Sequence, residues 1–465
     1  MYRSNSNPSM SWPRFVLALL VGLPLAGCEG VLEVTDPDIV TPDNLTSEIG
    51  LQTLRNGALG LFTTAYAGGG STDGQIMATG LMTDEWLHSG TFPTRFQADV
   101  RSAQNDNGTL SGVYFRLQRA RVALEDAAAK LDTLGSDPTN DERIGEMLAY
   151  AGFTYIAFGE NYCEGVPYSF QPETGDTEFG QPTTRDETFD LAIARFDAAI
   201  AHPAVASDVA DMARVGRGRV LLNQGNYAAA AAAVASVADG FVKVHRHSSN
   251  SSGQRNSIFE LNVSFGRWSI SDNEGINGLN FRSANDPRVQ WALCPGCAFD
   301  TSEQVPGTPA VGDNWQHTNY TSRNDPVRLA TGIEARLIET EADLRAGRTG
   351  NWLAKLNGLR AQWGSLASIV RGDATGTLAP LADPGTTTSR EDLMFRERAF
   401  WLFSTGHRLG DLRRLVRQYG RNAGSVFPTG AYFKAGANYG TDVVLLISQE
   451  EENNPNFSEC TNLSA

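Results

Sequence analysis

Apolar residues recur every three or four positions through much of this 465-residue chain. Such spacing is typical of amphipathic helices, which bury one face and expose the other. The stripes are clearest at residues 117–131, 144–158, 189–200, 212–222, 227–238, 329–346, 352–363, 395–403 and 409–416. Short connections between helices of this length favour antiparallel hairpins. The sequence therefore predicts a mainly α-helical protein.

One pair of predicted helices carries a more specific pattern. The helix at 212–222 is followed by a turn containing Gly225 and by an alanine-rich helix at 227–238. Small residues permit close helix packing and Tyr227 can fill the remaining gap, so that the pair resembles a tetratricopeptide unit. We expect a scaffold of tetratricopeptide-like helical hairpins around it.

The helical pattern is lost between residues 241 and 325, where Asn, Ser and Gly accumulate. Within this stretch, residues 258–263 alternate as in a short strand. A long irregular segment in a compact protein is usually functional or disordered, and the tryptophans in this one argue against disorder. We expect a loop-rich ligand-binding region here, and a second loop at residues 372–388.

The first 27 residues have the features of an export signal. Arg3 and Arg14 precede an apolar run at 15–26. This run is shorter than the roughly 18 residues that span a bilayer. Its end, Leu25-Ala26-Gly27-Cys28, resembles a bacterial lipobox, in which Cys28 is lipidated; an ordinary signal peptide with a chance cysteine is the alternative. We expect residues 28–46 to form a lipidated tether on a membrane surface.

Charge and cysteine content narrow the function further. The formal net charge is −15, without any Lys- or Arg-rich run, which argues against a nucleic-acid partner.

Beyond Cys28 four cysteines remain, and an even number in an exported chain favours disulfides. Three connectivities are possible, of which the simplest joins Cys294 to Cys297 and Cys163 to Cys460. A zinc site would need further ligands that the spacing does not supply, so no metal is expected.

Enzymatic motifs are absent from the sequence. It contains no zinc-protease, serine-hydrolase, P-loop or dinucleotide-binding motif, and we expect no cofactor. Asp84 and Glu85 beside Trp86 leave a glycosidase open, because catalytic carboxylates are paired in space and not in sequence. His245 and His247 could share a metal, although a surface turn is the favoured interpretation. We expect a binding protein and not an enzyme.

A set of motifs spread over the mature chain points to one family. The lipobox is followed by motifs at residues 34–45, 145–151, 165–167, 336–342, 357–360, 397–414 and 447–455. The most specific motif joins Glu397-Arg398 to Gly406-His407-Arg408 and Asp411-Leu412-Arg413-Arg414. Together they resemble the SusD/RagB family of outer-membrane nutrient-binding lipoproteins. The chain departs from the family pattern at Trp401 and Thr405, where Glu is usual, and at Ser448, where Pro is usual.

The resemblance implies a surface-exposed lipoprotein of the outer membrane. Such a protein captures glycan or peptide ligands and passes them to a SusC-like TonB-dependent transporter. It also implies an N-terminal helical region at 47–240 and a C-terminal region at 241–465, with loop-rich insertions and closing helices. A tetratricopeptide scaffold that binds other proteins is the alternative, and a surface glycosidase is a weaker one.

The most specific motif has a structural interpretation. Arg408 and Asp411 lie three residues apart, so they can form an ion pair on one helix turn. Gly406 permits a break between two helices. We therefore expect this motif to organise the core.

Exposed aromatic side chains in loops are the expected platform for a sugar or peptide ligand. The aromatic residues that fall outside the helical stripes are Trp86, Trp268, Trp291, Trp315 and Tyr320. The polar residues beside them that could add contacts are Asp84, Asn314 and Arg323.

Overall fold

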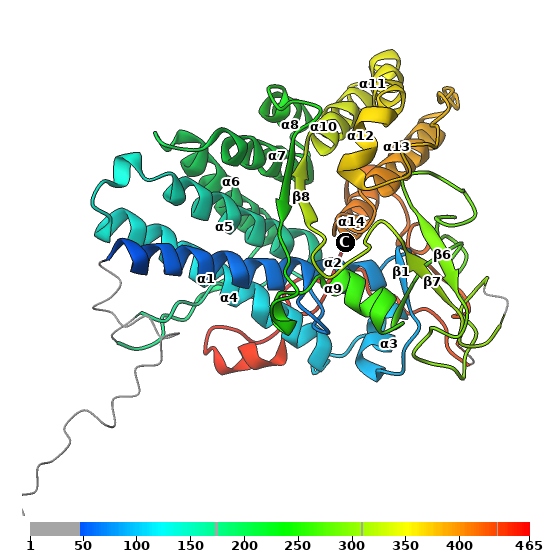
Figure 1. Cartoon of the computed structure of the whole chain (residues 1–465), viewed down its shortest axis with the longest axis horizontal. Coiled ribbons are helices and arrows are strands. Elements are labelled where there is room, and N and C mark those ends of the chain that lie inside the picture. Colours follow the sequence, from blue (N-terminus) through cyan, green and yellow to red (C-terminus); the bar gives the residue numbers. More distant parts are fainter. Residues whose placement is uncertain (1–46, 173–174, 308–309, 435) are drawn as a thin grey trace, which may run out of the picture. The chain divides into compact units, whose positions relative to one another are not determined.

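The helices and strands occupy most of the chain that the computed structural model describes, namely residues 47–172, 175–307, 310–434 and 436–465 (Figure 1). The described residues belong to one compact unit. The predicted signal at 1–27, the tether at 28–46 and Cys28 lie outside the described residues. No described helix is both long and apolar enough to span a bilayer.

The predicted mainly helical fold is confirmed. In the N-terminal half the helices are α1 (Glu48–Ala67), α2 (Gln75–Leu81), α3 (Pro93–Asp99), α4 (Gly108–Leu134), α5 (Glu142–Asn161), α6 (Arg185–Ala201), α7 (Ser207–Asn223) and α8 (Tyr227–Val234). In the C-terminal half they are α9 (Ser257–Phe259), α10 (Gly332–Arg345), α11 (Thr349–Ala361), α12 (Trp363–Val370), α13 (Thr387–Trp401) and α14 (Arg408–Tyr419). Helices α4 to α8 pack each against the next, and α10 continues the array from α8 (Figure 1).

Glycines allow the helices of this array to approach closely. Gly145, Gly152 and Gly159 are spaced by seven residues, or two helical turns, along one face of α5. A Cβ atom at Gly152 would lie 2.6 Å from the ring of Phe196 in α6. The ring therefore occupies the space that a side chain on α5 would need, which is how the two helices interlock.

The predicted tetratricopeptide-like pair is α7 and α8. The connecting turn places Gly225 at φ +78°, a conformation that favours glycine. Gly218 of α7 faces Val234 of α8, where an added Cβ would come within 2.5 Å of the valine side chain. The second helix ends at Val234, which is earlier than its apolar pattern predicts.

In the described part of the chain, the strands form four small antiparallel pairs. These are β1 (Trp86–His88) with β5 (Trp268–Ile270), β2 (Val166–Pro167) with β3 (Pro182–Thr183), β4 (Val242–His245) with β8 (Val327–Thr331), and β6 (Trp291–Cys294) with β7 (Asn314–His317). The predicted strand at 258–263 is wrong, because α9 and a π-helical turn (Glu260–Ser264) occupy it. Ile258 and Leu261 are both buried, and their spacing of three is helical.

The most specific motif forms a buried ion network, as its interpretation as core predicts. Asp411 accepts from Arg398 at 2.8 and 2.9 Å and from Arg414 at 2.8 Å. Arg414 also pairs with Glu341 of α10. Burial alone would raise the pKa of Asp411, but the two guanidinium groups hold that pKa below its usual range.

The expected ion pair between Arg408 and Asp411 is wrong. Arg408 instead binds both carboxylate oxygens of Asp84, at 2.6 and 2.8 Å. The side chain of Asp411 is already held by Arg398 and Arg414, which leaves Arg408 to the nearby Asp84. Gly406 does mark the break between α13 and α14, with φ +73°.

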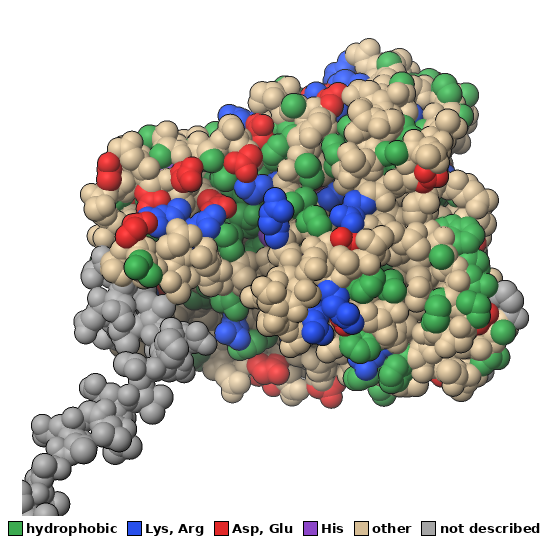
Figure 2. Space-filling model, viewed as in Figure 1, with side chains coloured by type: hydrophobic (Ala, Val, Ile, Leu, Met, Phe, Trp, Pro, Cys, Tyr) green, Lys and Arg blue, Asp and Glu red, His purple; other side chains and the backbone are tan. Residues whose placement is uncertain are grey.

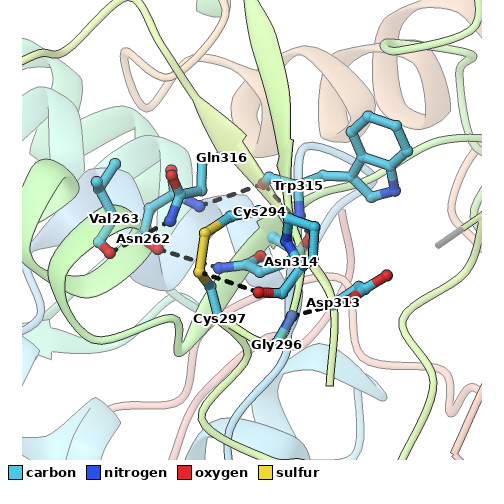
Figure 3. Close-up of a disulfide and its surroundings, with 11 residues drawn as sticks. Asn262, Val263, Cys294, Gly296, Cys297, Asp313, Asn314, Trp315 and Gln316 are labelled. Carbon is cyan, nitrogen blue, oxygen red and sulfur yellow. Dashed lines mark hydrogen bonds between the residues drawn. A yellow bond between two sulfur atoms is a disulfide. The ribbon is translucent and has the colours of Figure 1, made fainter. Parts of the chain in front are cut away.

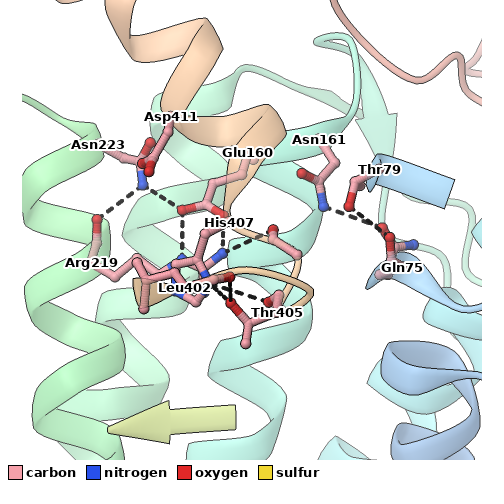
Figure 4. A network of polar contacts seen from close by, with 12 residues as sticks. Gln75, Thr79, Glu160, Asn161, Arg219, Asn223, Leu402, Thr405, His407 and Asp411 are labelled. Atoms are coloured by element: carbon pink, nitrogen blue, oxygen red, sulfur yellow. Dashed lines mark hydrogen bonds and ion pairs between the residues drawn. The ribbon is translucent and has the colours of Figure 1, made fainter. Parts of the chain in front are cut away.

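A second buried network joins α5, α7 and the start of α14 (Figure 4). Arg219 of α7 binds Glu160 of α5, and Asn223 donates to the same carboxylate at 2.6 Å. His407 lies 2.7 Å from Arg219 and 2.9 Å from Glu334. The helical array and the start of α14 are therefore joined by buried polar contacts as well as by apolar packing.

Two disulfides link the described cysteines. Cys163 is bonded to Cys460, across 297 residues of sequence, and Cys294 is bonded to Cys297. This is the pairing that is simplest from the sequence. The first disulfide ties the C-terminal segment to the end of α5, and the second closes a short turn after β6.

Candidate ligand-binding surface

Three of the aromatic residues predicted to contact ligand are buried. Trp86 and Trp268 are 0% exposed and Tyr320 is 4% exposed. Trp86 and Trp268 lie on β1 and β5, which are buried over their whole length. The expectation that these three side chains are exposed is therefore wrong, and they belong to the core.

The polar neighbours explain why the sequence is misleading at Trp86. Asp84 is itself buried and both of its oxygens are bound by Arg408. Glu85 is buried as well, it accepts from the backbone of Ser404, and burial raises its pKa to about 8. Neither carboxylate reaches the surface, so they form no exposed pair of the kind that a glycosidase would use.

Trp291 and Trp315 are half-buried on the β6–β7 hairpin. Their rings meet edge to face with centroids 4.6 Å apart, and the guanidinium of Arg282 lies 4.5 Å from the Trp315 ring. Figure 3 shows the indole of Trp315 pointing away from the Cys294–Cys297 disulfide. A role for these two residues in ligand binding stays a prediction.

The two remaining polar candidates are occupied within the protein. Asn314 is buried and donates to the backbone oxygen of Asn262 at 3.1 Å (Figure 3). Arg323 is exposed, but its guanidinium pairs with the buried Glu260. The structure thus brings Trp291, Trp315 and Asn314 together on strands β6 and β7, which do not include Arg323.

A cluster of exposed aromatic rings surrounds Arg267. The residues Phe92, Phe265 and Phe299 are 41%, 37% and 47% exposed. Their ring centroids lie 4.8, 5.1 and 4.8 Å from the guanidinium carbon of Arg267. Hydrophobic side chains, with Lys and Arg beside them, are visible over the region of α3 and the β6–β7 hairpin (Figure 2). We call Phe92, Phe265, Arg267 and Phe299 the Arg267 surface.

Three segments of chain hold the Arg267 surface together through their backbones. Because β1 and β5 are antiparallel, the residues after His88 and before Trp268 emerge at the same end of the pair. Ser89 donates its N–H to the carbonyl of Arg267 at 3.0 Å. Phe299 donates to the carbonyl of Gly266 at 2.8 Å, which ties in the turn closed by the Cys294–Cys297 disulfide.

Gly266 is required where two of these segments meet. Its φ is +58°, and the carbonyl of Cys297 occupies the position of an added Cβ. No other residue type fits so close to a neighbouring backbone. The position of Phe299 relative to Phe265 is therefore fixed by backbone contacts and not by the rings alone.

The Arg267 surface is a better stacking platform at two of its rings than at the third. The guanidinium of Arg95 also lies 4.8 Å from the Phe92 centroid, so this ring contacts two cations. Among the described cations, Phe265 and Phe299 each contact only Arg267 in this way. Aromatic faces pack well against the C–H groups of a sugar or an apolar side chain, and we regard these two rings as the principal contacts.

Sequence reasoning missed all four residues of this surface. It considered tryptophan and tyrosine in polar surroundings, whereas the exposed rings are phenylalanines. One signal was present: Phe265 and Phe299 both lie in the irregular stretch at 241–325, and Phe299 follows the Cys-Pro-Gly-Cys turn by two residues. Nothing in the sequence showed that Phe92 lies beside them.

A groove runs along α4. It has a volume of about 940 Å³ and is lined by Leu61, Tyr114, Phe115, Val122 and Phe170 among others. Phe115 is 58% exposed, whereas Tyr114 donates to Glu451 at 2.9 Å. The groove is apolar and open, and it is the second candidate for a ligand site.

The predicted surface turn at the histidine pair is wrong, because His245 and His247 are both buried and His245 ends strand β4. Among the described residues, no three His, Cys, Asp or Glu side chains gather where they could hold a metal ion. Burial, with smaller effects of His247 and Lys243, lowers the pKa of His245 to about 3. His245 packs against Phe62 with ring centroids 4.9 Å apart, so it is a neutral core residue.

Known proteins resemble this chain in structure but not in sequence. No protein-family model and no curated protein matches it. A SusD superfamily protein from Parabacteroides distasonis superposes with a TM-score of 0.64 at 13% identity, covering 91% of this chain and 100% of that one. Surface glycan-binding protein A from Bacteroides uniformis gives 0.62 at 14%, covering 89% and 99%. A laminarin-binding SusD-like protein gives 0.60 at 14%, again covering 89% and 99%. The chain therefore has the SusD fold.

Proposed function

We propose that this protein is a non-catalytic glycan-binding protein of the SusD type and that the Arg267 surface is its binding site. The observation that carries the proposal is the cluster of three exposed phenylalanines around one guanidinium, held in place by backbone hydrogen bonds. Solved proteins with the same fold are named as glycan-binding and laminarin-binding. Sugars present apolar C–H faces, which match exposed aromatic rings.

Replacing Phe265 or Phe299 with alanine is expected to weaken glycan binding by about 1–3 kcal/mol, or roughly 5- to 150-fold in Kd. Both rings are substantially exposed, so their removal leaves the fold intact. A glycan array probed with the soluble form beginning at Glu29 identifies a ligand. Isothermal titration calorimetry with that ligand then measures the loss.

Phe115→Ala is the matched control, because Phe115 is also an exposed phenylalanine but lines the groove along α4. It should bind the ligand as the unmodified protein does. If Phe115→Ala loses affinity while Phe265→Ala and Phe299→Ala do not, the groove is the site and the Arg267 surface is not.

The finer part of the proposal concerns the cell surface. We propose that Cys28 is lipidated, that the protein is displayed on the outer membrane, and that it delivers ligand to a SusC-like TonB-dependent transporter. The lipobox and the motifs at 397–414 support this part of the proposal. A gene for a large barrel with a plug domain beside this gene, and co-purification of its product, would test the partnership.

Replacing Cys28 with serine is expected to abolish membrane attachment. Because the thiol is the only acceptor for lipid at the predicted cleavage site, the variant should lose radiolabelled palmitate and leave the membrane fraction. The full chain is expressed in a Gram-negative host for this test, with Cys297→Ser as the control that keeps Cys28. A Cys28→Ser variant that still partitions fully with outer membranes contradicts the anchor.

A further inference from the structure

Among the described residues, the guanidinium of Arg267 has no hydrogen-bond or ion-pair partner. Its Nε is buried without a hydrogen bond, and no described carboxylate lies within 4.0 Å of its nitrogens. Three aromatic rings shield it in part from water. A charged group that loses water without gaining a partner is costly, and an incoming anion removes that cost.

The other cations nearby are already neutralised. Arg95 binds Asp73 through two nitrogens, with a shortest distance of 2.7 Å. Lys434 pairs with Asp300 at 3.1 Å and donates to the carbonyl of Gly90 at 2.6 Å. Arg95 and Lys434 thus have carboxylate partners, whereas no described carboxylate forms an ion pair with Arg267.

The neighbouring histidine does not change this balance. Burial, with contributions from Lys434 and Arg95, lowers the pKa of His88 to about 3, so it is neutral at physiological pH. The protein as a whole carries a formal net charge of −15. Arg267 is therefore a cation without a paired carboxylate among the described residues, on a protein of net negative charge, which favours capture of an anionic ligand at the Arg267 surface.

We propose that the preferred ligand is an acidic glycan and that Arg267 binds its carboxylate or sulfate group. A guanidinium presents parallel N–H donors that match either anion. Phe265 and Phe299 both lie within about 5 Å of the same guanidinium, so a sugar ring can pack against one of them while its anionic group reaches Arg267. This inference rests on the proposed function and adds to it the charge of the ligand.

The test compares matched acidic and neutral oligosaccharides on the soluble form beginning at Glu29. One arm uses oligogalacturonate and the same oligosaccharide with its carboxylates reduced to alcohols. The other uses a sulfated galactan oligosaccharide and its desulfated counterpart. In at least one arm, the acidic form should bind at least tenfold more tightly at low ionic strength, and the difference should shrink as salt is added. The arm that shows the preference identifies the anion.

Arg267→Gln should abolish the preference. We expect at least tenfold weaker binding of the acidic oligosaccharide and unchanged binding of the neutral one. Arg119→Gln is the matched control, because Arg119 also lies over an exposed phenylalanine, Phe115, at 5.8 Å from its centroid. It should leave both affinities unchanged. Circular dichroism of each variant checks that it is folded. If Arg267→Gln does not fold, the test is the preference of the unmodified protein for the acidic over the neutral oligosaccharides.

The outcomes separate this inference from the proposed function. Suppose that neutral glycans bind, that Phe265→Ala weakens this binding as expected, and that acidic forms bind no more tightly than neutral ones. The inference is then overturned and the glycan-binding function stands. If acidic forms are preferred but Arg267→Gln retains the preference, the anion is bound elsewhere and the inference is also overturned. If no oligosaccharide binds in either arm or on the array, both are wrong.

Discussion

Replacing Asp411 with asparagine is expected to lower the free energy of unfolding by about 3–5 kcal/mol, the usual cost of removing one partner from a buried ion pair. The carboxylate accepts from Arg398 and Arg414, and all three side chains are at most 5% exposed. An amide of the same shape offers one acceptor and cannot balance two guanidinium groups. Urea denaturation with linear extrapolation measures the loss.

A surface ion pair in the same protein supplies the control for Asp411→Asn. Asp211 lies 2.7 Å from Arg214 on α7, and both side chains are at least a quarter exposed. Because such pairs contribute little, Asp211→Asn should cost less than about 1 kcal/mol. If both variants lose the same small amount, Glu341 compensates for Asp411 and the network is not organised around that residue.

The helical scaffold could be predicted because its signals are local. The pair α7 and α8 follows from a 3–4 residue periodicity, a glycine turn and small residues, all within 30 residues of sequence. Residues 258–263 show where this reasoning fails. In a run of six residues, the spacing of apolar side chains does not distinguish a strand from a helix. The helical conformation buries both Ile258 and Leu261, which are three residues apart.

The contacts of the buried charges could not be predicted in the same way. Arg408 has a carboxylate three residues away, yet it binds Asp84, which is 324 residues distant. Local spacing shows which pairs are possible, but the fold decides which group is free. The same buried Asp84 made Trp86 look exposed, because a polar neighbour in sequence was interpreted as a sign of solvent.

The Arg267 surface was beyond sequence reasoning for a related reason. Phe92, Phe265 and Phe299 come from three separate segments that meet only because β1 pairs with β5 and because Gly266 packs on Cys297. Exposure of a ring depends on such contacts, and single-sequence patterns carry no record of them. The disulfide turn next to Phe299 was visible in the sequence, whereas its neighbours were not.

Removing the Cys163–Cys460 disulfide is expected to lower the free energy of unfolding by roughly 2–5 kcal/mol, because the bond closes a very long loop in the unfolded chain. It joins residues 297 apart, and backbone hydrogen bonds between Glu164 and residues 461 and 462 surround it. The double variant Cys163→Ser with Cys460→Ser should unfold at lower urea concentration. Its glycan affinity should be unchanged, since the Arg267 surface lies on other segments.

Removing the Cys294–Cys297 disulfide should affect glycan affinity more than stability. Its short loop contributes about 2 kcal/mol or less by the same entropic relation. Its turn, however, precedes Phe299 and packs against Gly266, so the double variant Cys294→Ser with Cys297→Ser frees one ring of the Arg267 surface. We expect a small loss of stability and a several-fold loss of glycan affinity, measured by urea denaturation and calorimetry on the same samples. Equal stability losses in the two double variants would contradict the loop-length argument, and an unchanged affinity in the second would show that the turn does not position Phe299.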